Sequence, residues 1–145
     1  MKPLNEIKIT LISKSNNESF ARAAIASFVA QLDPTVEELN DIKTAVSEAV
    51  TNCIVHAYRE NLGNIYITAG IYENRVIKLK IKDKGCGIEN LEQAMTPMYS
   101  SLGGERAGLG FAVMQTFMDK LSVRSVVNKG TTVTMSKRLS FRAQV

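Results

Sequence analysis

The sequence is short of the residues that mark several classes of protein. Its 145 residues include no tryptophan, one histidine and two cysteines, and aromatic residues make up only 6% of the chain. Cys53 and Cys86 do not have the spacing of metal ligands, so we expect them to be reduced thiols. The scarcity of aromatic side chains argues against a surface on which nucleic-acid bases stack.

Long hydrophobic runs are also absent. The longest nearly apolar stretch, residues 23–30, is far too short to span a bilayer, and residues 1–6 lack the apolar run of a secretory signal. We therefore expect a cytoplasmic protein that has no membrane partner.

The charge of the chain permits an anionic partner but does not require one. The formal net charge is +4 and the pI is near 9.1, yet the basic residues are scattered. Their densest group alternates along a predicted strand, at Lys78, Lys80, Lys82 and Lys84. Such alternation is typical of a solvated sheet face or a guarded edge, so we expect no direct contact with nucleic acid.

Composition and length predict one globular domain that covers residues 1–145. The hydrophobic fraction of 45% and the charged fraction of 22% are close to the averages for soluble proteins. A chain of this length can bury one hydrophobic core without disulfides or a structural metal.

Period-two alternation of apolar residues predicts five strands. The first contains Ile7, Ile9 and Leu11. The others are expected at residues 64–72, 75–82, 121–127 and 131–137. The short connections at 73–74 and 128–130 favour antiparallel pairing on both sides of each turn.

Apolar residues at helical spacing predict three helices, at residues 17–32, from Thr35 to about 58, and 111–119. Thr35 and Glu38 form a capping box at the start of the second helix. Residues 84–110 are glycine-rich and are expected to be irregular. We predict an α+β fold, a two-layer sandwich in which helices cover one face of a mostly antiparallel, mixed sheet.

One edge of the second predicted helix carries three polar side chains. Glu48, Asn52 and His56 are spaced by four residues, so they line up beside the apolar stripe of the helix. Polar groups in that position are costly to bury without partners. Spacing alone favours a partly exposed polar border.

A second set of residues follows the third predicted strand. Asp83 can accept a hydrogen bond from an exocyclic amine such as that of adenine, and Gly85 and Gly87 allow the backbone to approach a flat base. By itself the pattern is also that of an ordinary glycine turn.

The third set precedes the last predicted helix. Gly108 and Gly110 lie where helical periodicity resumes, and backbone donors at a helix N-terminus favour phosphate. Arg106 adds a charge that can reach such an anion. The pattern is neither a P-loop nor a dinucleotide fingerprint, and a flexible surface loop is the alternative.

Taken together, these segments resemble a known superfamily. Residues 47–52, 83–87, 108–110 and 130–132 are similar, in order and approximate spacing, to the N, G1, G2 and Gly-Thr boxes of the gyrase, Hsp90, histidine-kinase and MutL ATPases. The resemblance implies the histidine-kinase-like ATPase fold and a site for ATP or ADP with Mg²⁺.

A closer resemblance is to the anti-sigma F factors of spore-forming bacteria. It is carried by residues 17–22, 31–35, 47–52 and 105–111, and it extends over nearly the whole chain. It implies a serine kinase that holds a sporulation sigma factor inactive and phosphorylates a serine of an anti-anti-sigma protein. It also implies a homodimer.

The resemblance assigns roles to individual residues. Asn52 would bind Mg²⁺ through its side-chain oxygen, and Glu48 would be the general base for the acceptor serine. Asp83 would bind the adenine amine. The remaining assignments are Gly85, Gly87 and Thr131 near the base, Arg106, Gly108 and Gly110 near the phosphates under a lid at 96–107, and Arg22 at a partner contact. His56 is left without an assigned role, and a solvated helix arginine is the alternative for Arg22.

The chain departs from the family pattern at a few positions. Lys84 stands where the family often has an acidic residue, Leu102 or a neighbour stands where it often has a lysine, and the lid is about one residue shorter. We expect these changes to act on nucleotide affinity and lid dynamics.

Two other functions are compatible with the same fold. One is a nucleotide-gated protein-binding module with negligible kinase activity. The other is the catalytic domain of a histidine kinase, which is a poor fit because the single histidine, His56, belongs to the proposed ATP-site helix.

Overall fold

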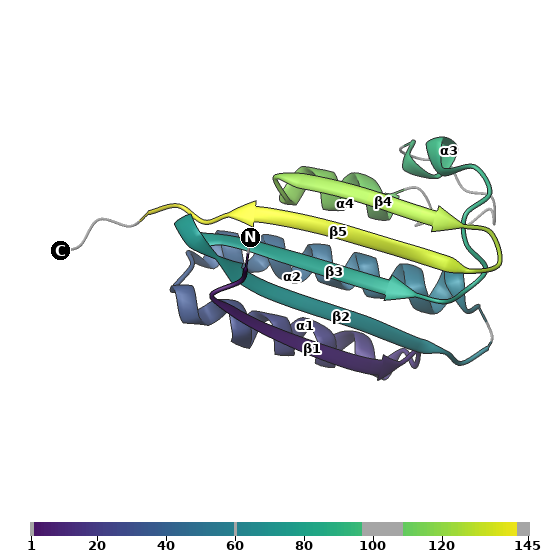
Figure 1. The fold of residues 1–145 in the computed structure, drawn as a ribbon, viewed down its shortest axis with the longest axis horizontal. Helices are drawn as coiled ribbons and strands as arrows, with labels where there is room; N and C mark the ends of the chain where they lie inside the picture. Colours follow the sequence, from purple (N-terminus) through teal and green to yellow (C-terminus); the bar gives the residue numbers. More distant parts are fainter. Residues whose placement is uncertain (1, 60, 97–108, 142–145) are drawn as a thin grey trace.

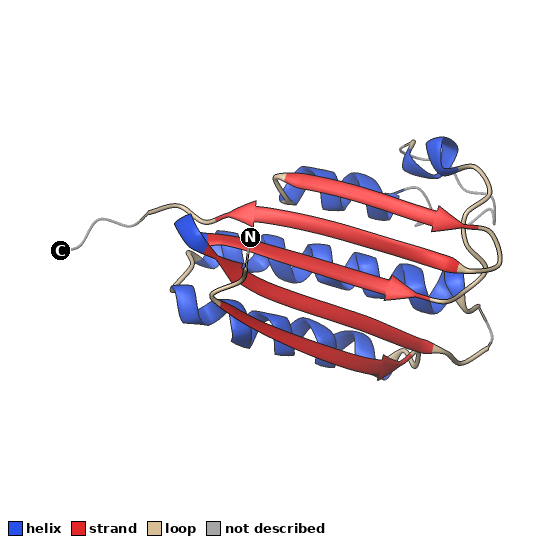
Figure 2. Cartoon of the chain, in the orientation of Figure 1, coloured by secondary structure: helices blue, strands red, loops and turns tan. Residues whose placement is uncertain are grey.

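The computed structural model describes residues 2–59, 61–96 and 109–141, and these form a sheet with helices on one face (Figures 1 and 2). The strands are β1 (Asn5–Ile12), β2 (Asn64–Tyr72), β3 (Val76–Asp83), β4 (Lys120–Val126) and β5 (Gly130–Arg138). The α-helices are α1 (Asn16–Val29), α2 (Val36–Asn52), α3 (Leu91–Met95) and α4 (Leu109–Phe117). Short turns of 3-10 helix occupy Ala30–Leu32 and Glu73–Arg75, and a π-helical turn occupies Cys53–Ala57.

The five strands follow the order β1-β2-β3-β5-β4. Each of the four pairings is antiparallel, so among the described strands the sheet is antiparallel throughout and not mixed. Two of the pairings are hairpins, in which the short connection forces the chain to reverse direction. The predicted α+β sandwich with helices on one face is confirmed.

The core lies between this sheet and helices α1, α2 and α4. The inward side chains of β2 and β3 are mostly isoleucines and leucine, and they are fully or almost fully buried: Ile65, Ile67, Ile71, Ile77, Leu79 and Ile81. The buried stripe of α2 faces them with Ile42, Ala45, Val46, Ala49 and Val50. This packing fixes α2 against β3, and it therefore fixes the polar edge of α2 relative to the end of that strand.

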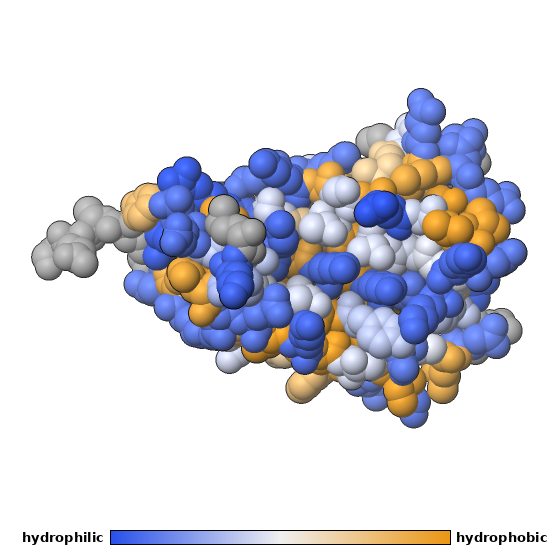
Figure 3. All heavy atoms as spheres, in the orientation of Figure 1, coloured by the Kyte–Doolittle hydropathy of each residue, from blue (hydrophilic) through white to orange (hydrophobic). Residues whose placement is uncertain are grey.

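The opposite face of the sheet carries the alternating lysines. Lys78, Lys80 and Lys82 are exposed on β3, which is the central strand and not an edge. In Figure 3, which views this face, hydrophilic and intermediate residues cover much of the surface. The alternating lysines therefore mark a solvated sheet face and not a guarded edge.

The hydrogen bonds at the start of α2 are those that the sequence predicts. The Glu38 backbone N–H donates to Thr35 Oγ1 at 3.0 Å, and the Thr35 N–H donates to Glu38 Oε1 at 2.9 Å. The predicted capping box is confirmed, because each residue satisfies the other's backbone donor.

The region expected to be irregular contains a short helix. In α3 the Asn90 side-chain oxygen accepts from the Gln93 N–H at 3.0 Å, and Ala94 and Met95 pack against the core. The expectation of an irregular chain was wrong for these five residues, because so short a helix has too few residues to show a period. Among the described residues, no helix combines the length and the apolar character that a membrane crossing requires.

Candidate functional site

The helix that carries Glu48, Asn52 and His56 changes its winding just after Asn52. Residues Cys53–Ala57 form a π-helical turn, in which the Tyr58 N–H donates to the Cys53 carbonyl at 3.0 Å. Such turns are rare and are frequent at functional sites. The carbonyls of His56 and Ala57 are left to face the loop that follows β3.

The loop after β3 docks on this turn through Cys86. The Cys86 N–H donates to the Ala57 carbonyl at 3.0 Å, and the Cys86 thiol donates to the His56 carbonyl at 3.3 Å. The approach requires a glycine one residue earlier, because a Cβ at Gly85 would lie 2.4 Å from the Ala57 oxygen. Gly87 also needs to be glycine, since its φ is +74°.

We expect the substitution Gly85→Ala to detach this loop from the π-helical turn. The added Cβ meets a backbone oxygen, which cannot rotate away, so the loss should be about 1–3 kcal/mol in the free energy of unfolding. Urea unfolding measures that loss, and nucleotide titration should show an affinity reduced by about tenfold or more.

The matched control is Lys84→Ala, which changes the neighbouring exposed side chain and keeps the backbone. The departure from the family pattern at Lys84 was expected to act on nucleotide affinity, but its side chain is exposed and lies over the Tyr66 ring, so both measurements should stay nearly unchanged. Equal behaviour of the two variants would mean that the docking of Gly85 on Ala57 is unimportant.

Asp83 is held in place by backbone donors from two segments. Its Oδ1 accepts from the Gly85 N–H at 2.9 Å and from the Thr131 N–H at 3.1 Å, and the residue is only 5% exposed. Burial raises the pKa of Asp83, while these two hydrogen bonds and one from the Cys53 side chain partly oppose the rise. Burial and the Asp83 charge raise the pKa of the Cys53 thiol well above its usual value, so the thiol stays protonated and can donate.

The first turn of α4 lies against the polar edge of α2. A Cβ built on Gly110 would be 3.2 Å from Asn52 Oδ1 and 3.3 Å from Glu48 Oε2. The Asn52 and Glu48 oxygens therefore both lie next to the first turn of α4, where Gly110 has no side chain. This arrangement brings an amide and a carboxylate from one helix together with the backbone of another.

Asn52 and Asp83 line one cavity of about 440 Å³ at the end of the sheet where β3 ends and β5 begins. The wall of the cavity is assembled from α2, the π-helical turn, the loop after β3, α3, α4 and β5. Among the sequence-predicted residues, those on its wall are Asn52, His56, Asp83, Gly87, Gly110 and Thr131. Glu48 lies beside Asn52 at Gly110, and Gly85, in the loop after β3, packs against Ala57.

Several predicted residues are not part of this description. Arg106, Gly108 and all of the predicted lid except Thr96 lie outside the described residues. Within the described residues, no cluster of three or more histidine, cysteine, aspartate or glutamate side chains could hold a metal ion. A Mg²⁺ site based on Asn52 would use one protein oxygen, with the other ligands coming from phosphates and water.

The cavity also contains residues that the sequence did not indicate. Arg59 lines it, and burial together with the Arg59 charge lowers the pKa of the neighbouring His56, so the imidazole is neutral near neutral pH. Arg59 has a φ of +55° just after the π-helical turn. The periodicity of the helix gave no sign that the chain turns this residue toward the cavity.

Lys84, where the chain departs from the family pattern, points away from the cavity. Its Nζ lies 5.2 Å from the centre of the Tyr66 ring, and its side chain is exposed. The Tyr58 hydroxyl accepts from the Lys84 backbone N–H at 2.7 Å, and Lys84 is not among the residues that line the cavity.

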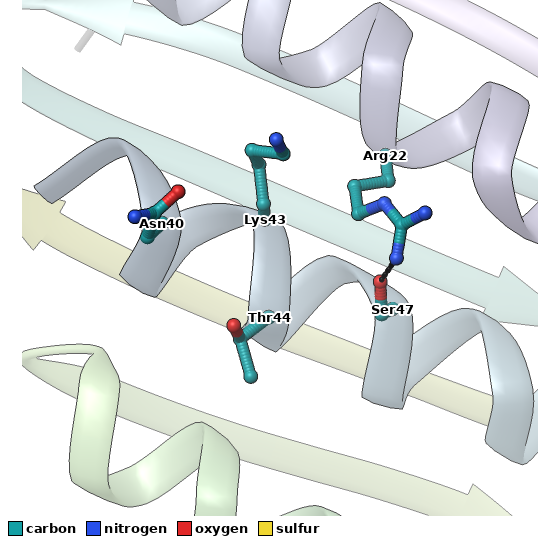
Figure 4. Close-up of a pocket in the computed structure, with 5 residues that line it drawn as sticks. All are labelled: Arg22, Asn40, Lys43, Thr44 and Ser47. Carbon is teal, nitrogen blue, oxygen red and sulfur yellow. Dashed lines mark hydrogen bonds between the residues drawn. The ribbon is translucent and has the colours of Figure 1, made fainter. Parts of the chain in front are cut away.

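Arg22 lies elsewhere, in a polar groove of about 350 Å³ between α1 and α2 (Figure 4). One of its nitrogens is 3.5 Å from a Glu18 carboxylate oxygen and 3.4 Å from Ser47 Oγ. The other residues that line the groove are Asn40, Lys43 and Thr44. The structure therefore separates the predicted partner residue from the predicted nucleotide residues.

Comparison with known sequences gives a consistent match. Residues 13–137 match the family model described as histidine kinase-like ATPase domain. An anti-sigma F factor of Caldanaerobacter subterraneus subsp. tengcongensis is 57% identical over 134 residues, which cover 92% of this chain and 93% of that protein. An anti-sigma F factor of a Thermoanaerobacter species is 55% identical over 138 residues, with coverages of 94% and 96%.

Solved structures share the fold at lower identity. The RsbU and RsbW domains of a Mycobacterium tuberculosis protein match with a TM-score of 0.72 and 22% identity, over 98% of this chain and 34% of that chain. The histidine kinase domain of a blue-light activated histidine kinase from Erythrobacter litoralis matches with a TM-score of 0.58 and 20% identity, over 84% and 60%. At these identities the likeness concerns the fold alone.

Proposed function

Since this chain belongs to the histidine kinase-like ATPase domain family and, within it, to the anti-sigma F factors, we propose that it is an ATP-dependent serine kinase. It would hold a sporulation sigma factor inactive and phosphorylate a serine of an anti-anti-sigma protein. The supporting observation is the shared cavity, whose wall contains Asn52 and Asp83, with Glu48 next to Asn52.

The nucleotide would bind with its base at the Asp83 end of the cavity. The Asp83 carboxylate would accept a hydrogen bond from the exocyclic amine, and Gly87 and Thr131 lie on the same wall of the cavity. Gly85 would act indirectly, because it lets the loop pack against Ala57. Asp83 suits this role because two backbone N–H groups already fix its orientation, so little ordering remains to be done on binding.

The phosphates would lie toward α4. Gly110 offers backbone without a side chain beside Asn52, and Arg106 and Gly108, which lie outside the described residues, precede it in the sequence. The Asn52 side-chain oxygen is the hard type of donor that Mg²⁺ prefers, and it lies at this end of the cavity. When bound there, Mg²⁺ neutralises charge on the phosphates.

Transfer would require a base for the acceptor serine. The serine oxygen forms a bond to the γ-phosphorus, the bond from that phosphorus to the ADP oxygen breaks, and the Glu48 carboxylate takes the serine proton. Glu48 is one helical turn from Asn52, so base and metal ligand are held by the same rigid helix.

The partner side of the proposal rests on Arg22. Its groove between α1 and α2 is lined by cationic, hydroxyl and amide groups, which can bind an acidic residue of a protein partner. We further propose that the protein acts as a homodimer in the cytoplasm.

The test is to incubate the protein with labelled ATP, Mg²⁺ and candidate anti-anti-sigma and sigma proteins. Acid-stable phosphoserine on the anti-anti-sigma protein, together with co-elution of the sigma factor, is the expected result. ATP-dependent co-elution without phosphoserine would instead identify a nucleotide-gated binding module. Acid-labile phosphate on His56 would identify a histidine kinase.

A further inference from the structure

The face of the sheet opposite the helices gathers basic residues from distant parts of the chain. Eight exposed basic side chains lie on it, against one acidic side chain, Glu6 on β1. The rest of the 145-residue chain has ten basic and thirteen acidic residues, so the positive net charge of the protein is concentrated on this face. The eight are Lys78, Lys80 and Lys82 on β3, Lys84 directly after it, Lys8 on β1, Lys120 and Arg124 on β4, and Arg138 on β5.

The strand register sorts these side chains into columns. On β5, the strand between β3 and β4, the hydroxyl groups of Thr132, Thr134 and Ser136 lie directly beside Lys82, Lys80 and Lys78. Beyond them on β4, Arg124 is opposite Thr132 and Lys120 is opposite Ser136. On the other side, Thr68 of β2 stands between Lys80 and Lys8. Columns of basic residues therefore alternate with columns that contain hydroxyl groups.

The basic residues of this face are not neutralised by acids of the same molecule. Within the described part of the chain, no ion pair involves any of them. The Lys78 Nζ instead lies 5.5 Å from the centre of the Tyr72 ring. Lysines two positions apart on one strand repel each other, and a bound anion relieves that repulsion.

The composition of the face favours phosphate groups over an acidic protein surface. Protein interfaces are depleted in lysine and rely on buried aromatic and apolar anchors. Here lysine is the commonest cation, and the exposed apolar residues Ile12 and Val126 belong to the edge strands β1 and β4. Lysine, arginine, serine, threonine and tyrosine are the side chains that contact phosphate oxygens in nucleic acids.

Spacing and shape favour a duplex over a membrane. Successive lysines of β3 are two residues apart on an extended strand, about 6.6–6.8 Å. That is twice the axial distance of about 3.4 Å between phosphates of one strand of a duplex. A sheet also twists by about 20–25° from strand to strand, so its face is a saddle. A saddle can follow a cylinder along one diagonal, whereas a flat lipid surface touches less of it.

We propose that this face binds duplex nucleic acid through its phosphate backbone, without reading its sequence. The proposal is independent of the ATP site, and it replaces the expectation of no contact with nucleic acid. The basic residues are scattered along the sequence and come together only in the assembled sheet. A duplex keeps its bases stacked on each other, so the scarcity of aromatic residues is no obstacle.

The test is fluorescence anisotropy of a labelled DNA duplex of about 20 base pairs, titrated with the whole protein at several salt concentrations. If about four phosphates are neutralised, the logarithm of the binding constant should fall with that of the salt concentration at a slope of about −3.6. Affinity should then drop by about 10²-fold between about 50 and 200 mM salt. Changing Lys80 and Lys82 together to glutamine should halve the slope and weaken binding at the lower salt by about tenfold or more.

The matched control changes Lys14 and Lys43 to glutamine, which removes the same charge from outside the face. It should keep the parental slope and an affinity within about threefold of the parent. Arginine at positions 80 and 82 keeps the charges and should also preserve the slope. Because Lys80 and Lys82 are exposed, the variants should fold, and urea unfolding verifies this.

The other outcomes exclude the proposal. Equal losses in the two glutamine double variants would mean that net charge alone is responsible. No binding of the parent at about 50 mM salt would exclude a duplex site on this face. Tighter binding to phosphatidylserine-containing vesicles than to the duplex would identify a membrane surface, and tighter binding to polyglutamate would identify an acidic protein.

Discussion

Replacing Glu48 by glutamine is expected to reduce phosphoryl transfer to serine by about 10²–10⁴-fold while ATP affinity stays within about twofold. Glutamine keeps the size of the side chain and its oxygen near Gly110, where Glu48 Oε2 lies beside the Asn52 amide. It cannot accept the serine proton. The loss should therefore appear in the rate of transfer and not in nucleotide binding.

Single-turnover transfer from labelled ATP to the anti-anti-sigma protein measures this rate. Glu37→Gln, at an exposed position in the first turn of the same helix, is the matched control and should transfer at the parental rate. Unchanged transfer by Glu48→Gln would exclude Glu48 as the base. Such a result would also favour a binding module, because a pure binder has no use for a carboxylate at that position.

The change Asp83→Asn is expected to reduce ATP affinity by about 10–100-fold, the usual value of a hydrogen bond to a charged group. An asparagine oxygen can still accept from the Gly85 and Thr131 N–H groups, so the loop should remain in place. The side-chain NH₂ would then face the adenine amine, donor against donor, where the carboxylate offered only acceptors.

Titration calorimetry with ATP measures the affinity, and urea unfolding establishes that the variant is folded. Glu73→Gln removes one negative charge at the exposed turn between β2 and β3, at the other end of β3, and should bind ATP as the parent does. Equal affinities of Asp83→Asn and the parent would remove Asp83 from the base-binding site.

Local patterns in the sequence predicted most of the elements. The capping box at Thr35 and Glu38 located the start of α2, and alternation located all five strands to within about one or two residues. These patterns are local, because capping depends on four neighbouring residues and alternation on one strand. They did not place Asn52 near Asp83; that expectation came from the resemblance of the two segments to motifs of the ATPase superfamily.

The π-helical turn could not be predicted in the same way. The helix was expected to continue to about residue 58, but α-helical geometry ends at Asn52 and the wider turn covers Cys53–Ala57. One extra residue in a single turn hardly changes an apolar pattern. Arg59 was missed for this reason, since its direction depends on where that turn ends.

Contacts between distant segments account for what else was missed. The docking of Cys86 on Ala57 and the contact of Ser125 with Ile88 join residues about thirty to forty positions apart, and no local pattern records them. The position of β5 between β3 and β4 is likewise a property of the assembled sheet.

That position of β5 has a consequence for synthesis of the protein on the ribosome. Among the described strands, β5 comes last in the sequence and occupies an interior place in the sheet, so a nascent chain that lacks residues 130–138 has an unpaired edge on β3 and no neighbour for β4. Such a chain also lacks Thr131. The ribosome must therefore release β5 before the sheet can close, and until then the exposed edge is a place where chaperones or other nascent chains can pair.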